Sequence, residues 1–269
     1  MYLNPLPLAY AGKGFMNETT ALGLPYGGIS DVANFNGQSG SSVVANTGSL
    51  LLSSDTVTMA VWIKWNSGEH FTGSCCGARQ EVLGADSSSN NEVNPIIAVN
   101  DSGTNEAETW VCTSNGCWPE AQSPANAIQK NKWYFLVSRY NGTDLSLWTN
   151  DKQVAETAAS GNLLAQGSGN YAYIGSRGDG GSFFNGSIAD AQIYNVALSS
   201  AQIQDLYLNN TVSGATPVAY WPLSTGLNGM LNQTPDIING NTGYLYSGSG
   251  QCTVAEVADG TCGVEYAQP

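Results

Sequence analysis

The chain has 269 residues, of which 42% are hydrophobic and 11% charged, so it can bury a sizeable core and is not a disordered polymer. Its 8 basic and 21 acidic residues give a net charge of −13, which repels phosphate backbones and anionic membranes. Nucleic acid is therefore excluded as a partner. No segment approaches the length of apolar sequence that spans a bilayer, so no membrane insertion is expected.

Alternation of apolar and polar residues predicts an all-β, antiparallel fold. Alternate positions from Val57 to Trp65 form one apolar face. The segment from Trp133 to Trp148 predicts a hairpin that turns at Asn141-Gly142. Further strands are expected over residues 153–155, 171–175 and 187–194. Glycine- and asparagine-rich turns between them are typical of a β-sandwich.

One short helix is expected after the last of these strands. Ser199 and Gln202 have the spacing of a capping box, and Ile203, Leu206 and Tyr207 form one apolar stripe. Residues 209–216 then have the composition of a linker. The apolar run over residues 218–223 predicts a strand-like segment ahead of a cysteine loop.

Six cysteines, an even number, indicate an oxidising compartment and disulfide bonds. Cys112 and Cys117 flank Asn115-Gly116, a tight-turn pair, which predicts a disulfide across a hairpin. By similar reasoning, a disulfide between Cys252 and Cys262 is expected to close a loop near the C-terminal end of the sequence. Cys75 and Cys76 pair with each other or cross with another pair. Zinc is not expected, because the cysteines lack the spacing of a zinc site and His70 is the sole histidine.

Four segments in order resemble the laminin G-like, concanavalin A-like jelly roll of microbial surface proteins. The segments are VANFNG (32–37), VTMAVWIKW (57–65), the hairpin over residues 132–154, and the closing strand and helix over residues 184–207. The resemblance implies a jelly-roll domain over residues 31–209, an N-terminal extension over residues 1–30 and a C-terminal extension over residues 210–269.

Domains of this family often hold one calcium ion between the opening and closing strands. The resemblance places the Asn36 side chain, the Gly37 carbonyl and Asp190 in this role, as part of the six to eight oxygens that calcium prefers. Two carboxylates of the family pattern are replaced, by Asn36 and Ala189. The alternative is an ordinary strand pair with an exposed Asp190.

The C-terminal extension holds a segment, residues 217–245, that resembles the opening of such a domain but follows it instead. The same order occurs in surface and pilin-like proteins of small-genome archaea, which this chain resembles. The extension has three possible fates: it packs on its own sandwich, begins a truncated second domain, or pairs with the sheet edge of another molecule. In the third case the chain is a filament subunit, and deletion of residues 210–269 abolishes assembly but leaves the sandwich folded.

Catalysis is not expected. Glucanases of this superfamily carry three acidic residues on one strand. Glu106-Ala107-Glu108 places two carboxylates on one face of a strand, but the third residue is missing. His70 lacks the surroundings of a Ser-His-Asp triad.

A ligand-binding surface is expected around the Cys112–Cys117 hairpin. Trp110 and Trp118 flank the hairpin, and Arg79 and Glu108 are expected nearby, which together would form a sugar-stacking surface with polar partners. The alternative is that both tryptophans pack in the core or at its rim. Asn141, Asn185 and Asn17 begin Asn-x-Ser/Thr sequons and are the predicted glycosylation sites.

The sequence therefore predicts a non-catalytic extracellular surface protein that binds surface glycans or glycoproteins, with calcium as its candidate cofactor. The alternative is self-assembly into filaments through the terminal extensions.

Overall fold

The computed structural model describes residues 32–47, 55–66, 78–87, 92–100, 103–164, 170–178, 180–224 and 230–267. The predicted N-terminal extension, Asn17, Cys75 and Cys76 lie outside these residues.

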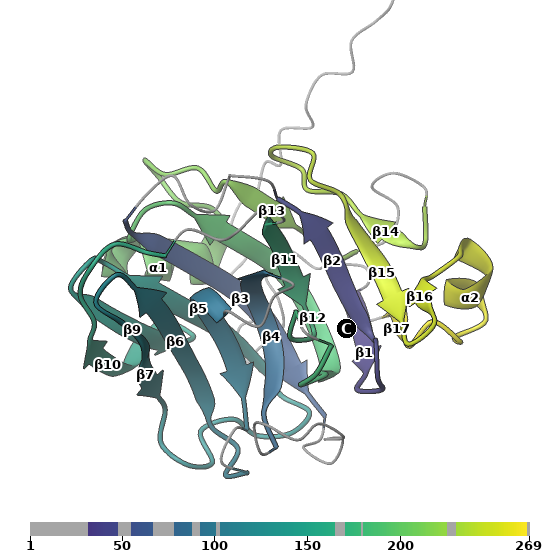
Figure 1. The fold of residues 1–269 in the computed structure, drawn as a ribbon, viewed down its shortest axis with the longest axis horizontal. Helices are drawn as coiled ribbons and strands as arrows, with labels where there is room; N and C mark the ends of the chain where they lie inside the picture. Colours follow the sequence, from purple (N-terminus) through teal and green to yellow (C-terminus); the bar gives the residue numbers. More distant parts are fainter. Residues whose placement is uncertain are drawn as a thin grey trace, which may run out of the picture.

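Two antiparallel sheets pack face to face as a β-sandwich, which confirms the predicted fold class (Figure 1). One sheet has eight strands: β10 (Lys152–Ala158), β9 (Asp144–Thr149), β8 (Trp133–Tyr140), β3 (Val57–Trp65), β12 (Asn185–Tyr194), β1 (Val32–Asn36) and β17 (Val264–Ala267) in this order, and β13 (Ala219–Trp221) pairs with β12. The other has nine: β14 (Gln233–Thr234), β15 (Gly243–Ser247), β2 (Ser42–Asn46), β11 (Asn170–Ile174), β4 (Gln80–Ser87), β5 (Glu92–Val99), β6 (Ala107–Thr113) and β7 (Gly116–Gln122), and β16 (Gly250–Gln251) pairs with β15.

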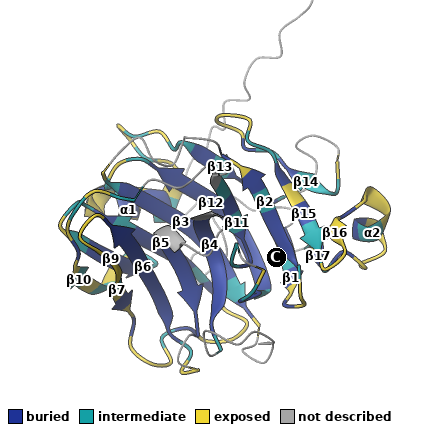
Figure 2. Ribbon diagram, viewed as in Figure 1, coloured by how far each residue is buried: buried dark blue, intermediate teal, exposed yellow. Residues whose placement is uncertain are grey.

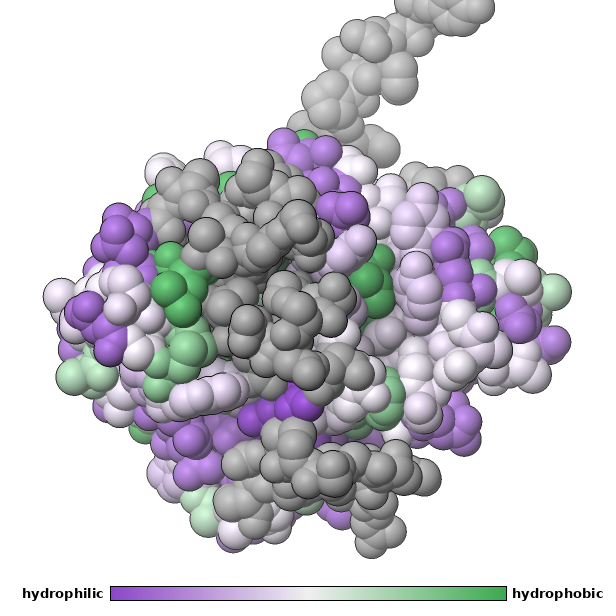
Figure 3. All heavy atoms as spheres, viewed as in Figure 1, coloured by the Kyte–Doolittle hydropathy of each residue, from purple (hydrophilic) through white to green (hydrophobic). Residues whose placement is uncertain are grey.

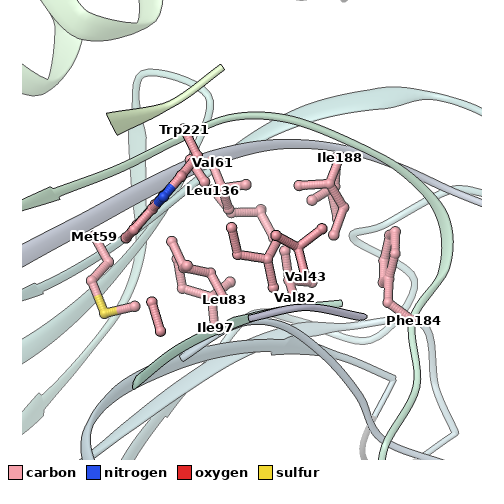
Figure 4. Close-up of a cluster of buried hydrophobic side chains, with 14 of the residues drawn as sticks. Val43, Met59, Val61, Val82, Leu83, Ile97, Leu136, Phe184, Ile188 and Trp221 are labelled. Atoms are coloured by element: carbon pink, nitrogen blue, oxygen red, sulfur yellow. The ribbon is translucent and has the colours of Figure 1, made fainter. Parts of the chain in front are cut away.

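The core fills the space between the two sheets (Figure 4). Val61, Leu136 and Ile188 project from the eight-stranded sheet toward Val43 and Ile97 of the nine-stranded sheet. The inward strand positions are buried, whereas the turns and the short helix α2 (Val254–Ala258) carry most of the exposed residues (Figure 2). The predicted apolar face of residues 57–65 is thus confirmed.

Helix α1 (Ser200–Asn209) covers the outer face of the eight-stranded sheet. It begins with the predicted capping box, in which Ser199 Oγ accepts from the Gln202 amide and Gln202 Oε1 accepts from the Ser199 amide. Ile203 and Leu206 are buried, and the Tyr207 ring stacks on Trp62 with 5.5 Å between the ring centroids. The apolar stripe therefore gives the outer face of this sheet a second, smaller core. No helix among the described residues is long and apolar enough to cross a bilayer.

Strands β4 and β5 did not emerge from the sequence pattern. β4 contains Gly84, β5 contains Pro95, and the pairing between these two strands shifts register twice, which interrupts a period-two pattern. The β6–β7 hairpin also differs in detail from the prediction. Its disulfide Cys112–Cys117 is present, but the turn residues are Ser114 and Asn115, and Gly116 already pairs with Thr113.

Residues 219–224 and 230–267 pack on their own sandwich, the first of the three predicted fates. β17 pairs with β1 in one sheet, and β15 pairs with β2 in the other, so this segment extends both sheets at the same side of the molecule. Trp221 and Leu245 are completely buried in the main core. The predicted Cys252–Cys262 disulfide holds the loop that precedes β17. The expectation that the sandwich folds without residues 210–269 stays a prediction, and the burial and strand pairing of this segment argue against it.

Candidate functional site

The two tryptophans predicted to bind a ligand lie together on the outer face of the nine-stranded sheet, and the structure gives them different environments. Their ring centroids are 6.4 Å apart. Trp110 is buried at 3% exposure, whereas Trp118 is 58% exposed. Trp110 therefore matches the alternative expectation of a packing residue, and Trp118 is available to a ligand.

A β-bulge presents Trp118. Trp110 pairs with Glu120 and Cys112 pairs with Cys117, so a single β6 residue faces both Trp118 and Pro119. The φ angle of Trp118 is +78°, which is rare for a bulky residue, and the following Pro119 restricts its backbone further. The neighbouring disulfide fixes the hairpin in this arrangement.

Arg79 also reaches this face, as predicted. Its guanidinium carbon lies 4.3 Å from the centroid of the Trp110 ring, and its Nη2 atom lies 3.3 Å from Glu81 Oε1. The guanidinium thus stacks on the buried tryptophan while it pairs with a carboxylate. Glu81 is a site residue that the sequence analysis missed, because β4 was not recognised as a strand.

Glu108, the fourth predicted ligand-binding residue, lies in the same row as Glu81. Ala98 of β5 pairs with Glu81 on one side and with Glu108 on the other. The two carboxylate-bearing residues are thus two strand spacings apart, roughly 10 Å between Cα atoms. Both are buried at 1% exposure. The structure therefore brings Arg79, Glu108, Trp110 and Trp118 together on one surface, and their role in binding stays a prediction.

A second aromatic group lies farther along the same sheet face. Tyr171, Tyr173 and Tyr246 line a hollow of about 430 Å³ over β11, β2 and β15, together with Arg177. Tyr173 pairs through Gly84 and Ile96 with Trp110, so about three strand spacings, roughly 14 Å, separate the two aromatic groups. Figure 3 shows the described surface of the molecule from this side as mainly hydrophilic, with scattered hydrophobic residues.

The three predicted calcium ligands do not share a site. Asn36 pairs with Asn185, which places Asp190 five residues farther along β12, roughly 15 Å away. Asn36 Oδ1 accepts from the Gln38 amide, and Gly37 adopts φ +71° at the end of β1. Asp190 is buried at a bulge in β12, where it accepts a hydrogen bond from the Tyr220 hydroxyl. The family pattern failed here because the hydroxyl of Tyr220, from the C-terminal segment, donates a hydrogen bond to the Asp190 carboxylate. Calcium binding stays a prediction without these three residues as a joint ligand set.

The predicted glycosylation sites that the structure describes differ in setting. Asn141 lies at the turn between β8 and β9, where its Oδ1 accepts from the Thr143 and Asp144 amides. Asn185 begins β12, and Ser187 of its sequon is buried and hydrogen-bonded to Asn34. A glycan is therefore easier to accommodate at Asn141 than at Asn185.

Residues 36–204, more than half of the chain, match the family model of the concanavalin A-like lectin/glucanases superfamily, of the laminin G type. The chain belongs to this superfamily. The match ends inside α1, so the strands β13 to β17 of this concanavalin A-like domain lie beyond the matched region.

Solved structures share the fold at low sequence identity. A candidate carbohydrate-binding protein from Bacteroides ovatus is 14% identical with a TM-score of 0.60, and the alignment covers 89% of this chain and 60% of that one. The heptameric SAP-like pentraxin from Limulus polyphemus is 18% identical with a TM-score of 0.51 over 66% of this chain and 82% of that one. The CBM40 module of the Ruminococcus gnavus IT-sialidase, solved with α2,3-sialyllactose, is 14% identical with a TM-score of 0.50 over 67% of this chain and all of that one. The chain thus spans less than two thirds of the Bacteroides protein. No curated protein matches the chain.

Proposed function

We propose that this concanavalin A-like domain is a non-catalytic, extracellular surface protein that binds glycans through the outer face of its nine-stranded sheet. The exposed Trp118 ring is the stacking platform, and the buried Trp110 beneath it holds the platform in place. The observation that carries the proposal is the 58% exposure of a tryptophan at a strained backbone position. A solvent-facing indole at positive φ costs stability, and such strain is typical of functional positions.

The surroundings of Trp118 favour sugars over other ligands. Sugar rings have apolar faces that stack on aromatic rings, and hydroxyl groups that bind planar polar side chains. Arg79, Glu81 and Glu108 lie on the same face but are buried, so they hold Trp110 beneath the exposed ring and make the surroundings of the platform polar. The low overall charge density and the net charge of −13 suit a neutral glycan better than an anionic one. The carbohydrate-binding neighbours and the two disulfides support a glycan-binding protein of an oxidising, extracellular compartment.

We expect Trp118→Ala to weaken glycan binding at least about tenfold, because an exposed aromatic anchor carries a large share of such binding energy. Binding is measured on an array of neutral and acidic glycans, followed by titration of each glycan that binds. Trp118→Phe keeps an aromatic face and is expected to retain part of the affinity. Because the domain is proposed to be non-catalytic, we expect no hydrolysis of the bound glycans, measured as release of reducing sugar.

Tyr244→Ala is the matched control, because Tyr244 is another exposed aromatic residue of the same sheet, in β15 near the edge opposite β7. It is expected to bind like the wild type. Equal loss of binding in Trp118→Ala and Tyr244→Ala, or no glycan binding by the wild type, would contradict the proposal.

Assembly into filaments is the second candidate function. The observation in its favour is that β15 and β17, both from the C-terminal segment, occupy positions beside β2 and β1 that an identical segment of a neighbouring chain would fit equally. An archaeal source would accord with this alternative.

Electron microscopy of the protein from its native source, or refolded under oxidising conditions, distinguishes the two functions. Ordered fibres with one chain per repeat are the result expected of a filament subunit. Dispersed single particles, together with a monomeric mass in solution, would dismiss strand exchange and leave glycan binding as the function.

A further inference from the structure

A polar row crosses the outer face of the other, eight-stranded sheet. Glu265 of β17 pairs with Asn34 of β1, Asn34 pairs with Ser187 of β12, and Ser187 pairs with Lys64 of β3. The Ser187 hydroxyl donates to Asn34 Oδ1. The row continues the face that α1 covers with apolar contacts at Trp62, so this sheet changes from apolar to polar along its strands.

A row of four asparagines runs beside it, at the ends of neighbouring strands. Asn36 pairs with Asn185, and the backbone amide of Asn66 donates to the backbone carbonyl of Asn185 over 2.9 Å. The backbone amide of Asn131, the fourth asparagine, donates to the backbone carbonyl of Trp65 over 2.7 Å, which holds Asn131 beside β3. The side-chain amides of Asn66 and Asn131 make no hydrogen bond with any residue that the structure describes.

These two rows enclose a pocket of about 530 Å³. Gly260 and Gly263, on either side of Cys262, form a third wall, and Phe35 also contributes to the lining. Gly263 has φ +84°, and a Cβ atom there would lie 3.1 Å from the Asn36 amide, so glycine allows this wall to approach the asparagine row. The volume lies within the range of small-molecule sites. The C-terminal segment therefore completes the pocket.

The chemistry of the lining selects among ligand classes. Five asparagine side chains and one hydroxyl offer donors and acceptors without charge. A cation meets Lys64 and a single carboxylate, Glu265, which falls short of the oxygen ligands that calcium needs. An anion meets Lys64, but also Glu265 and a protein of net charge −13, so the lining holds no net positive charge that would favour it. An apolar ligand would leave the amides without partners, which is costly.

We propose that this amide-lined pocket binds a neutral sugar unit, as a second site on the face of the sandwich opposite Trp118. Each planar amide supplies a donor and an acceptor on one edge, which matches a pair of adjacent sugar hydroxyls. The compact volume fits one or two sugar units rather than an extended polymer. With sites on both sheets, one molecule bridges two glycans, which increases avidity on a glycan-covered surface.

The test uses the whole chain, labelled with ¹⁵N at asparagine side-chain amides, and records NMR spectra during titration with methyl glycosides of glucose, galactose, mannose and N-acetylglucosamine. At least one glycoside is expected to shift the side-chain amides of Asn34, Asn66 and Asn131 with a saturable dissociation constant. Asn66→Ala and Asn131→Gly are each expected to weaken this binding about fivefold to tenfold, because each removes one amide that contacts the ligand. Glycine keeps the positive φ of +61° at position 131.

Asn209→Ala, which removes an exposed asparagine at the end of α1, is the matched control and is expected to bind like the wild type. Trp118→Ala is also expected to retain the asparagine shifts, which separates failure of this site from failure of the proposed function. Shifts that follow calcium chloride or glycylglycine but none of the glycosides would overturn the proposal, as would unchanged binding in Asn66→Ala and Asn131→Gly with unchanged thermal midpoints.

Discussion

Deletion of residues 210–269 is expected to abolish the cooperative unfolding transition of the sandwich. The segment contributes Trp221, Leu223, Leu245 and Val264 to the core, each with no exposed surface. Burial of a large apolar side chain contributes about 1.5–3 kcal/mol, so the loss approaches the typical total stability of a domain, about 5–15 kcal/mol. The deletion also leaves the edges of β1 and β2 without the partners β17 and β15. Thermal and urea unfolding followed by near-ultraviolet circular dichroism measure the effect.

A single substitution tests the same contribution without removing strands. Trp221→Ala is expected to destabilise the fold by about 3–5 kcal/mol, the usual range for a buried aromatic residue. The indole also loses its hydrogen bond to the Asn241 carbonyl, 2.8 Å long. Ile237→Ala, in the same segment but at a half-exposed position, is the matched control and is expected to change stability by less than about 0.5 kcal/mol. A truncated chain that unfolds cooperatively would show instead that residues 32–209 form a complete domain.

Stability is expected to fall between about pH 4 and pH 6 because of Asp190. Burial raises the pKa of Asp190 from 3.8 to about 6, and the hydrogen bond from Tyr220 opposes part of this shift. The folded protein therefore holds a proton on Asp190 that the unfolded chain has already released in this interval. Stability from this group is highest below pH 4, declines as the pH rises, and is constant above pH 6. A shift of about two pKa units corresponds to about 3 kcal/mol.

Urea unfolding at several pH values, with Asp190→Asn as the comparison, isolates this contribution. Asparagine mimics the neutral carboxyl, accepts from Tyr220 and does not titrate. The variant is expected to lack the decline between pH 4 and pH 6, and to be more stable than the wild type at pH 7. Glu256 and Asp259, whose pKa values are lowered by hydrogen bonds from Thr253 and Thr261, act in the opposite direction in both proteins. An identical pH profile for the two proteins would contradict this account of Asp190.

The sequence by itself determined the fold class and the elements with strong local signals. The alternation over residues 57–65, the capping box at Ser199 and the hairpin at Asn141 depend on neighbours in the chain, and the structure has all three. The hairpin disulfide followed for the same reason, since Cys112 and Cys117 are five residues apart. Turn chemistry and side-chain periodicity act locally, so one sequence contains enough information to predict them.

Tertiary structure decided which residues meet across strands. Glu81 and Glu108 lie on either side of Ala98, and Arg79 stacks on Trp110, because β4 and β5, two bulged strands that the pattern concealed, come before β6 in the sheet. Asp190 accepts a hydrogen bond from Tyr220 and lies far from Asn36, because the register between β1 and β12 pairs Asn36 with Asn185. Register is a non-local property. The asparagine pocket is formed by segments more than 200 residues apart, from β1 to β17, and pairing between such distant segments depends on the packed sheet and not on local sequence.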